Sequence, residues 1–104
     1  MLEIAEIVQT IEHVQSAFED LTVRGLRSAG PDQLATLSAL REEFERIGAG
    51  HLAGRIAAVV ETRSATALLR AQASLRVFER VLTLQVAAQT LSALLESANA
   101  EDES

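Results

Sequence analysis

The sequence predicts an all-α, single-domain protein folded as a four-helix bundle. Its 104 residues hold one proline and five glycines, and 48 % of them are hydrophobic although only 3 % are aromatic. Apolar residues recur at steps of three and four, the spacing of one helix face, and they do not alternate with polar residues as they would in a strand. We expect residues 1–98 to form the bundle and residues 99–104 to form an acidic disordered tail.

The first helix is expected over residues 2–26. Its apolar stripe follows steps of 3, 4, 3, 4 and 3, and consists of Ile4, Ile7, Ile11, Val14, Phe18 and Leu21. The next positions of that stripe would be Gly25 and Ser28, so the pattern weakens there. The following SAGPD, residues 28–32, carries the glycine and proline that are typical of a helix end.

A second helix is expected over residues 31–47 and a third over 51–63. Pro31 suits the first turn of a helix, where its missing N–H is not needed. Gly48 suits the left-handed position that closes a helix. The intervening GAG, residues 48–50, could be a tight turn between antiparallel helices or a kink between nearly collinear ones. Short connections between helices favour the turn, and with it a helical hairpin.

The longest helix is expected over residues 65–98, with Ser64 or Thr62 as its cap. A second apolar stripe, at steps of 4 and 3, consists of Val77, Val81, Leu84, Ala88, Leu91, Leu95 and Ala98. Residues 81–95 are apolar on most sides, because their polar residues are limited to two threonines, two glutamines and one serine. A helix of this kind needs to be buried nearly all round.

Three arrangements could cover this long helix. It could lie at the centre of a self-contained bundle, it could pair with a second copy through the last helix, the first helix or both, or it could dock on a different protein. An exposed surface of this size would be unusual for a monomer. For the two association alternatives, the predicted contact residues are Val77, Val81, Leu84, Leu91 and Leu95, followed by Ile4, Ile11 and Phe18.

The net charge of −6 is distributed unevenly. Residues 1–23 carry −5, residues 24–80 carry +3 and residues 81–104 carry −4. The acidic ends could act simply to keep the protein soluble. Alternatively, the arginine-rich middle could contact an acidic partner or the acidic ends of the protein itself. All nine basic residues are arginine, which we interpret as the coding bias of a GC-rich bacterium.

The same composition argues against nucleic-acid and membrane binding. Arg63, Arg70, Arg76 and Arg80 could form a row that meets phosphates. The overall negative charge, the absence of lysine and the scarcity of aromatic residues for base stacking oppose that interpretation. No transmembrane span is expected, and the N-terminal segment lacks the positive charge of a signal peptide, so we expect a cytoplasmic protein.

The sequence offers little for catalysis or metal binding. Cysteine is absent, which excludes thiol catalysis and thiolate metal sites. His13 and His51 lack the helical spacing to a second ligand that zinc or di-iron sites need. The carboxylates lie beside arginines on predicted solvent faces, and Glu79 is expected to pair with a neighbouring arginine. We expect neither an enzyme nor a cofactor or metal.

Two helical segments carry a family resemblance. LREEFERIGAGHLAGRIAAVV, residues 40–60, and LLRAQASLRVFERVLTLQVA, residues 68–87, resemble helical segments that accompany bacterial SWIM zinc-finger proteins. Those proteins tend to be encoded beside AAA+ ATPases and von Willebrand A-type proteins. The resemblance covers residues 34–87 and implies a helical accessory part of a multi-protein system. Zinc binding does not carry over, because the SWIM signature needs cysteine ligands.

The predicted function is therefore a non-enzymatic helical interaction or assembly module. It would self-associate through its first and last helices or dock on a helical partner protein. The alternative is a small bundle that binds an apolar ligand along the last helix.

Overall fold

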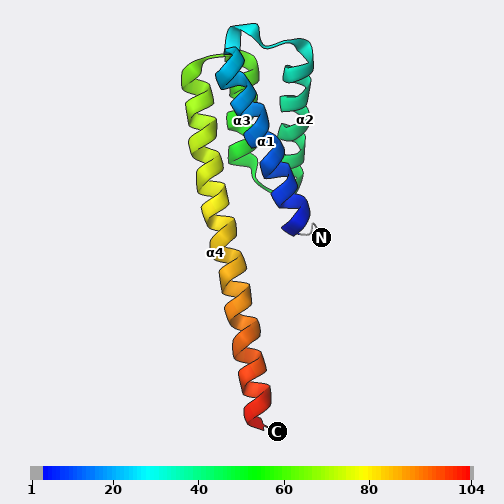
Figure 1. Cartoon of the computed structure of the whole chain (residues 1–104), viewed down its shortest axis with the longest axis vertical. Helices are drawn as coiled ribbons and strands as arrows, with labels where there is room; N and C mark the ends of the chain where they lie inside the picture. The colour runs from blue at the N-terminus through cyan, green and yellow to red at the C-terminus, as the bar shows by residue number, and fades with distance from the viewer. Residues whose placement is uncertain (1–3, 104) are drawn as a thin grey trace.

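The chain folds into a four-helix bundle in which successive helices run in opposite directions (Figure 1). The computed structural model describes residues 4–103. Its elements are α1 (Ile4–Arg24), the short 3-10 turn η1 (Leu26–Ser28), α2 (Pro31–Ile47), α3 (Gly50–Thr62) and α4 (Ala65–Glu103). The predicted all-α bundle with a central hairpin and one long C-terminal helix is confirmed.

Helix α1 ends where its apolar stripe ends. Gly25 has a φ of 89°, a conformation that glycine adopts without steric cost, and it breaks the helix after Arg24. The predicted end at residue 26 is wrong by two residues, because η1 forms a separate turn there. The predicted start at residue 2 lies outside the described residues.

The connection between α2 and α3 is a tight turn, so the hairpin alternative is confirmed. Gly48 has a φ of 95° in the left-handed region. This conformation lets the N–H of Ala49 donate to the carbonyl oxygen of Phe44 at 2.8 Å, which satisfies a carbonyl at the end of α2. The chain then reverses, and α3 packs along α2 (Figure 1).

The core lies between the four helices and draws on all of them. Phe44, Val14 and Ile56 are fully buried, and the Phe44 ring meets the Phe78 ring of α4 edge to face at 5.7 Å. Ile11 and Phe18 of α1 belong to this core, with 6 % and 2 % of their surface exposed. Their side chains are therefore covered by the chain itself.

Helix α4 begins at a serine cap and continues to Glu103. The Ser64 hydroxyl accepts a hydrogen bond from the N–H of Ala67 at 3.1 Å. Of the two predicted candidates, Ser64 and Thr62, Ser64 is therefore the cap. The predicted end at residue 98 is wrong, because α4 continues through Glu103. Residues 99–103, which we expect to belong to an acidic disordered tail over 99–104, are helical. No glycine or proline follows Ala65, and alanine and glutamate propagate a helix readily.

The molecule is elongated because α4 runs well past the other three helices (Figure 1). It measures 64 Å by 22 Å by 21 Å. Its radius of gyration of 17.6 Å compares with about 13 Å for a compact domain of this length. None of the helices within residues 4–103 has the length and apolar character needed to cross a membrane.

Candidate interaction surface

The second predicted stripe lies on one side of α4, which we call the outer face. It is formed by Val77, Val81, Leu84, Ala88, Leu91, Leu95 and Ala98. The steps of 4 and 3 keep these residues on a narrow strip, as in the seam of a coiled coil. The strip covers 22 residues, or about 33 Å of helix at 1.5 Å per residue.

The outer face points away from the bundle. Leu75 is 4 % exposed, whereas Val77, two residues later, is 62 % exposed. Two residues correspond to about 200° around an α-helix, so the two side chains lie on opposite sides. Leu82 and Leu84 repeat the contrast, because Leu82 packs against the core and Leu84 is 64 % exposed. Helix α4 therefore carries one apolar face that packs on the bundle and a second that lies in solvent.

The exposure continues along the extension of α4. Val81, Leu91 and Leu95 remain 46 %, 59 % and 57 % exposed. Every side chain from Ala87 through Ala100 is exposed. No charged residue occurs between positions 81 and 95, so water meets an apolar, uncharged stretch of about four helical turns.

The total surface area of the chain is also large, which agrees with the exposed extension of α4. The accessible surface is 7170 Å², about 1,500 Å² above the 5,700 Å² or so expected for a folded monomer of 11.2 kDa. A surface of this kind, large and apolar, is typical of a site that contacts another macromolecule.

The structure separates the eight predicted contact residues into two groups. All five predicted on α4 lie together on the outer face. Ile11 and Phe18 were also predicted as contacts, and this is corrected: their stripe faces the core of the same chain. Ile4 is 43 % exposed, but it lies on α1 and not on the outer face. Leu94, which the prediction omits, is 63 % exposed but lies about 100° around α4 from Leu95, at the side of the outer face; the charge-free run through residue 95 is the signal that includes it.

Three arginines of α4 precede the charge-free residues 81–95, at the end of the outer face that is nearer the bundle. Arg70, Arg76 and Arg80 are exposed on α4. Among the side chains that the structure describes, the ion pairs involve Arg41 and Arg46 of α2 and none of these three. The Glu79 carboxylate, predicted to pair with an arginine, instead accepts a hydrogen bond from the Gln15 amide of α1. The three arginines are therefore available to a partner.

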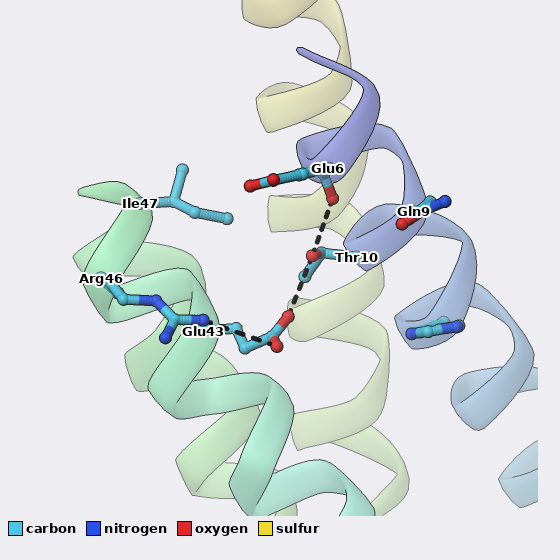
Figure 2. A pocket seen from close by; sticks show the side chains of 7 residues that line it. Glu6, Gln9, Thr10, Glu43, Arg46 and Ile47 are labelled. Carbon is cyan, nitrogen blue, oxygen red and sulfur yellow. Dashed lines mark hydrogen bonds and ion pairs between the residues drawn. The ribbon is translucent and has the colours of Figure 1, made fainter. Parts of the chain in front are cut away.

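A small pocket lies between α1 and α2 and is lined mainly by charged and polar side chains (Figure 2). Its volume is about 210 Å³, and it is lined by Glu6, Gln9, Thr10, His13, Glu43, Arg46 and Ile47. The Thr10 hydroxyl lies 3.0 Å from the Glu6 carbonyl oxygen and 2.9 Å from Glu43 Oε2, and its single proton can serve one of them at a time. Arg46 Nη2 lies 3.5 Å from Glu43 Oε1.

These contacts link α1 to α2. His13 is exposed to solvent, and the Glu43 carboxylate is shared between Thr10 and Arg46. Among the side chains of residues 4–100, no three histidines or carboxylates come close enough together to hold a metal ion. We therefore interpret the pocket as a structural contact between two helices.

Two shallow grooves follow the seam between α1 and α4. One lies over Phe18 and Leu75, and the other lies over Ile11 and Leu82. Both are open to solvent, and neither is lined by a residue of the outer face. They do not form the enclosed apolar cavity that usually holds a small molecule.

Comparison with protein-family models, with curated proteins and with solved structures finds no match to this chain. The resemblance of residues 34–87 to SWIM-associated helical segments therefore stays a prediction.

Proposed function

We propose that this protein is a non-enzymatic helical assembly module that self-associates through the outer face of α4. The observation that carries the proposal is the extension of α4 beyond the bundle with its leucines in solvent and no charge over residues 81–95. Burial of apolar surface is the main favourable term in protein association. A surface that the chain itself leaves open is therefore the part of the molecule best suited to a partner.

The exposed surface of the chain is of the size that an interface needs. A standard protein interface buries about 800 Å² on each partner. The surface excess of about 1,500 Å² per chain, relative to a compact monomer, belongs to the whole elongated molecule, and the outer face is one part of it. Area alone does not fix the affinity, because association also costs translational, rotational and side-chain entropy.

The extension also has little internal support as an isolated helix. Residues 87–100 make no buried contact, and short helices without tertiary contacts are marginal in water. Valine and threonine in residues 81–90 further lower the intrinsic helix propensity. Packing against a second helix would supply the missing stabilisation.

Light scattering at two protein concentrations tests the proposal. The wild-type chain is expected to increase in mass with concentration, whereas Leu84→Asp is expected to remain a helical particle of smaller mass. If the variant has the same mass as the wild type at every concentration, the assignment of the contact to the outer face is wrong.

Other elements of the function stay predictions. Action in the cytoplasm, and a role within a bacterial multi-protein system, follow from the sequence and its resemblance. The alternative of an apolar ligand bound along α4 has no enclosed cavity to favour it, since the grooves beside α4 are open.

A further inference from the structure

The charges on α4 are divided between its two ends. Before the charge-free stretch of residues 81–95, α4 carries the exposed Arg70, Arg76 and Arg80, with Glu79 as the one acid. After that stretch, its residues include Glu96 and the acidic run 101–103 and no base. An apolar strip with a basic end and an acidic end is complementary to a copy of itself in reversed orientation.

We propose that the outer face is covered by α4 of a second copy running antiparallel, so that each acidic end lies beside the arginines of the partner subunit. This inference rests on the proposed function, and it specifies the partner and its orientation. The parallel alternative would place four acids beside four acids and arginines beside arginines. Like charges held next to each other oppose association, and opposite charges favour and orient it.

The residue spacing agrees with an antiparallel pair centred at Ala88. Val81 lies seven residues before Ala88, and Leu95 lies seven residues after it. In the pair, Val81 of one subunit would therefore lie level with Leu95 of the other. Arg80 and Glu96 each lie eight residues from Ala88 and would likewise be level with each other. The acidic run 101–103 would lie level with residues 73–75, between Arg70 and Arg76.

The centre of this arrangement suits close contact. Alanine at position 88 lets two helix backbones approach, and the surrounding Leu84 and Leu91 would fill the space on either side. A two-fold axis through this point makes the contact isologous, so one surface serves both copies. The bundles would then lie at opposite ends of a shared two-helix rod, away from each other.

Distances between spin labels test the orientation. The chain has no cysteine, so Gln89→Cys and Ser97→Cys each introduce a single thiol for a nitroxide label. Gln89 lies about 100° around the helix from Ala88, and Ser97 lies about 200° around it from Leu95, so both positions lie off the outer face. In the antiparallel pair the two labels at 89 are separated by about 3 Å along the rod, and the two labels at 97 by about 27 Å.

The measurement distinguishes failure of the orientation from failure of the proposed function. A much longer distance at 97 than at 89 supports the antiparallel pair. Distances that differ by only a few ångströms between the two positions mean a parallel pair, which overturns this inference and leaves self-association intact. If sedimentation shows that neither the labelled variants nor the wild type associates, the proposed function itself is wrong.

A conservative charge change gives a second, independent readout. Glu96→Gln removes a carboxylate that lies level with Arg80 of the partner subunit in an antiparallel pair. The two side chains lie on opposite sides of the apolar strip, so no direct contact is lost and association should weaken by about twofold. In a parallel pair the same change removes a repulsion between two glutamates and strengthens association. Glu61→Gln, an exposed carboxylate of α3, is the matched control and should leave the association constant unchanged. Stronger association of Glu96→Gln would overturn the proposal.

Discussion

Replacement of Leu84 by aspartate is the most informative single change, because this side chain lies near the middle of the outer face. Leu84 is 64 % exposed in the isolated chain. Full burial of a leucine contributes about 1.5–3 kcal/mol, so burying the exposed part contributes about 1–2 kcal/mol per copy. A pair buries two such side chains and would lose about 2–4 kcal/mol, equivalent to about 30- to 700-fold weaker association.

The aspartate adds a cost of its own, because a carboxylate buried in an apolar contact without a partner is unfavourable. The loss of about 30-fold is therefore a lower bound. The folded monomer should be little affected, since substitutions at exposed sites usually change the unfolding free energy by about 0.5 kcal/mol or less.

Sedimentation equilibrium over a range of concentrations measures the association constant, and circular dichroism checks that the fold is retained. Leu69→Asp is the matched control, because Leu69 is also on α4 and is 63 % exposed. In a pair centred at Ala88, Leu69 lies beyond the end of the overlap. Association through the outer face is ruled out if Leu84→Asp and Leu69→Asp have the same association constant as the wild type, or if both weaken association equally.

Three further changes test the fold that presents this surface. Phe44→Ala should lower the unfolding free energy by about 3–5 kcal/mol in urea denaturation, because Phe44 is fully buried; a loss under about 1 kcal/mol would contradict its place in the core. Ser64→Ala should cost about 1 kcal/mol, whereas Ser64→Asp retains a capping oxygen and should cost less; equal losses would argue against the cap. A chain that ends after Val86 should remain a folded monomer with an unfolding free energy within about 0.5 kcal/mol of the dissociated wild type, because residues 87–100 are exposed; loss of the fold would show that they support the bundle.

Periodicity was sufficient to predict the fold and the connection between the hairpin helices. The glycine at position 48 and the proline at position 31 marked helix ends that the structure confirms. Steps of three and four also placed the apolar residues of α1 and α4 on the correct faces. These signals are local in the chain, which is why they can be interpreted without knowledge of the tertiary arrangement.

Periodicity could not show which apolar stripe would be buried and which would be exposed to solvent. The stripe containing Ile11 and Phe18 and the stripe containing Val77 and Leu84 have the same spacing, yet the first is buried and the second is exposed. The difference depends on helix length. At 1.5 Å per residue, α4 with 39 residues is about 58 Å long, whereas α2 with 17 residues covers about 26 Å.

The end of α4 was also beyond the reach of the sequence pattern. The apolar stripe stops at Ala98, and the following residues are polar and acidic, so the pattern indicated a tail. Helix propagation depends on the backbone and needs no apolar face, and no residue after 98 interrupts it before Glu103. The acidic residues after 98 therefore continue the same helix as the outer face.

Amide hydrogen exchange along α4, measured at low and high protein concentration, tests whether a second copy covers this helix. Amides of residues 84–98 should exchange fast in dilute solution and become protected as concentration rises, while the core amides of α2 and α3 stay protected throughout. Exchange of residues 84–98 that remains fast and unchanged at the highest concentration would contradict the claim that a second copy covers this helix.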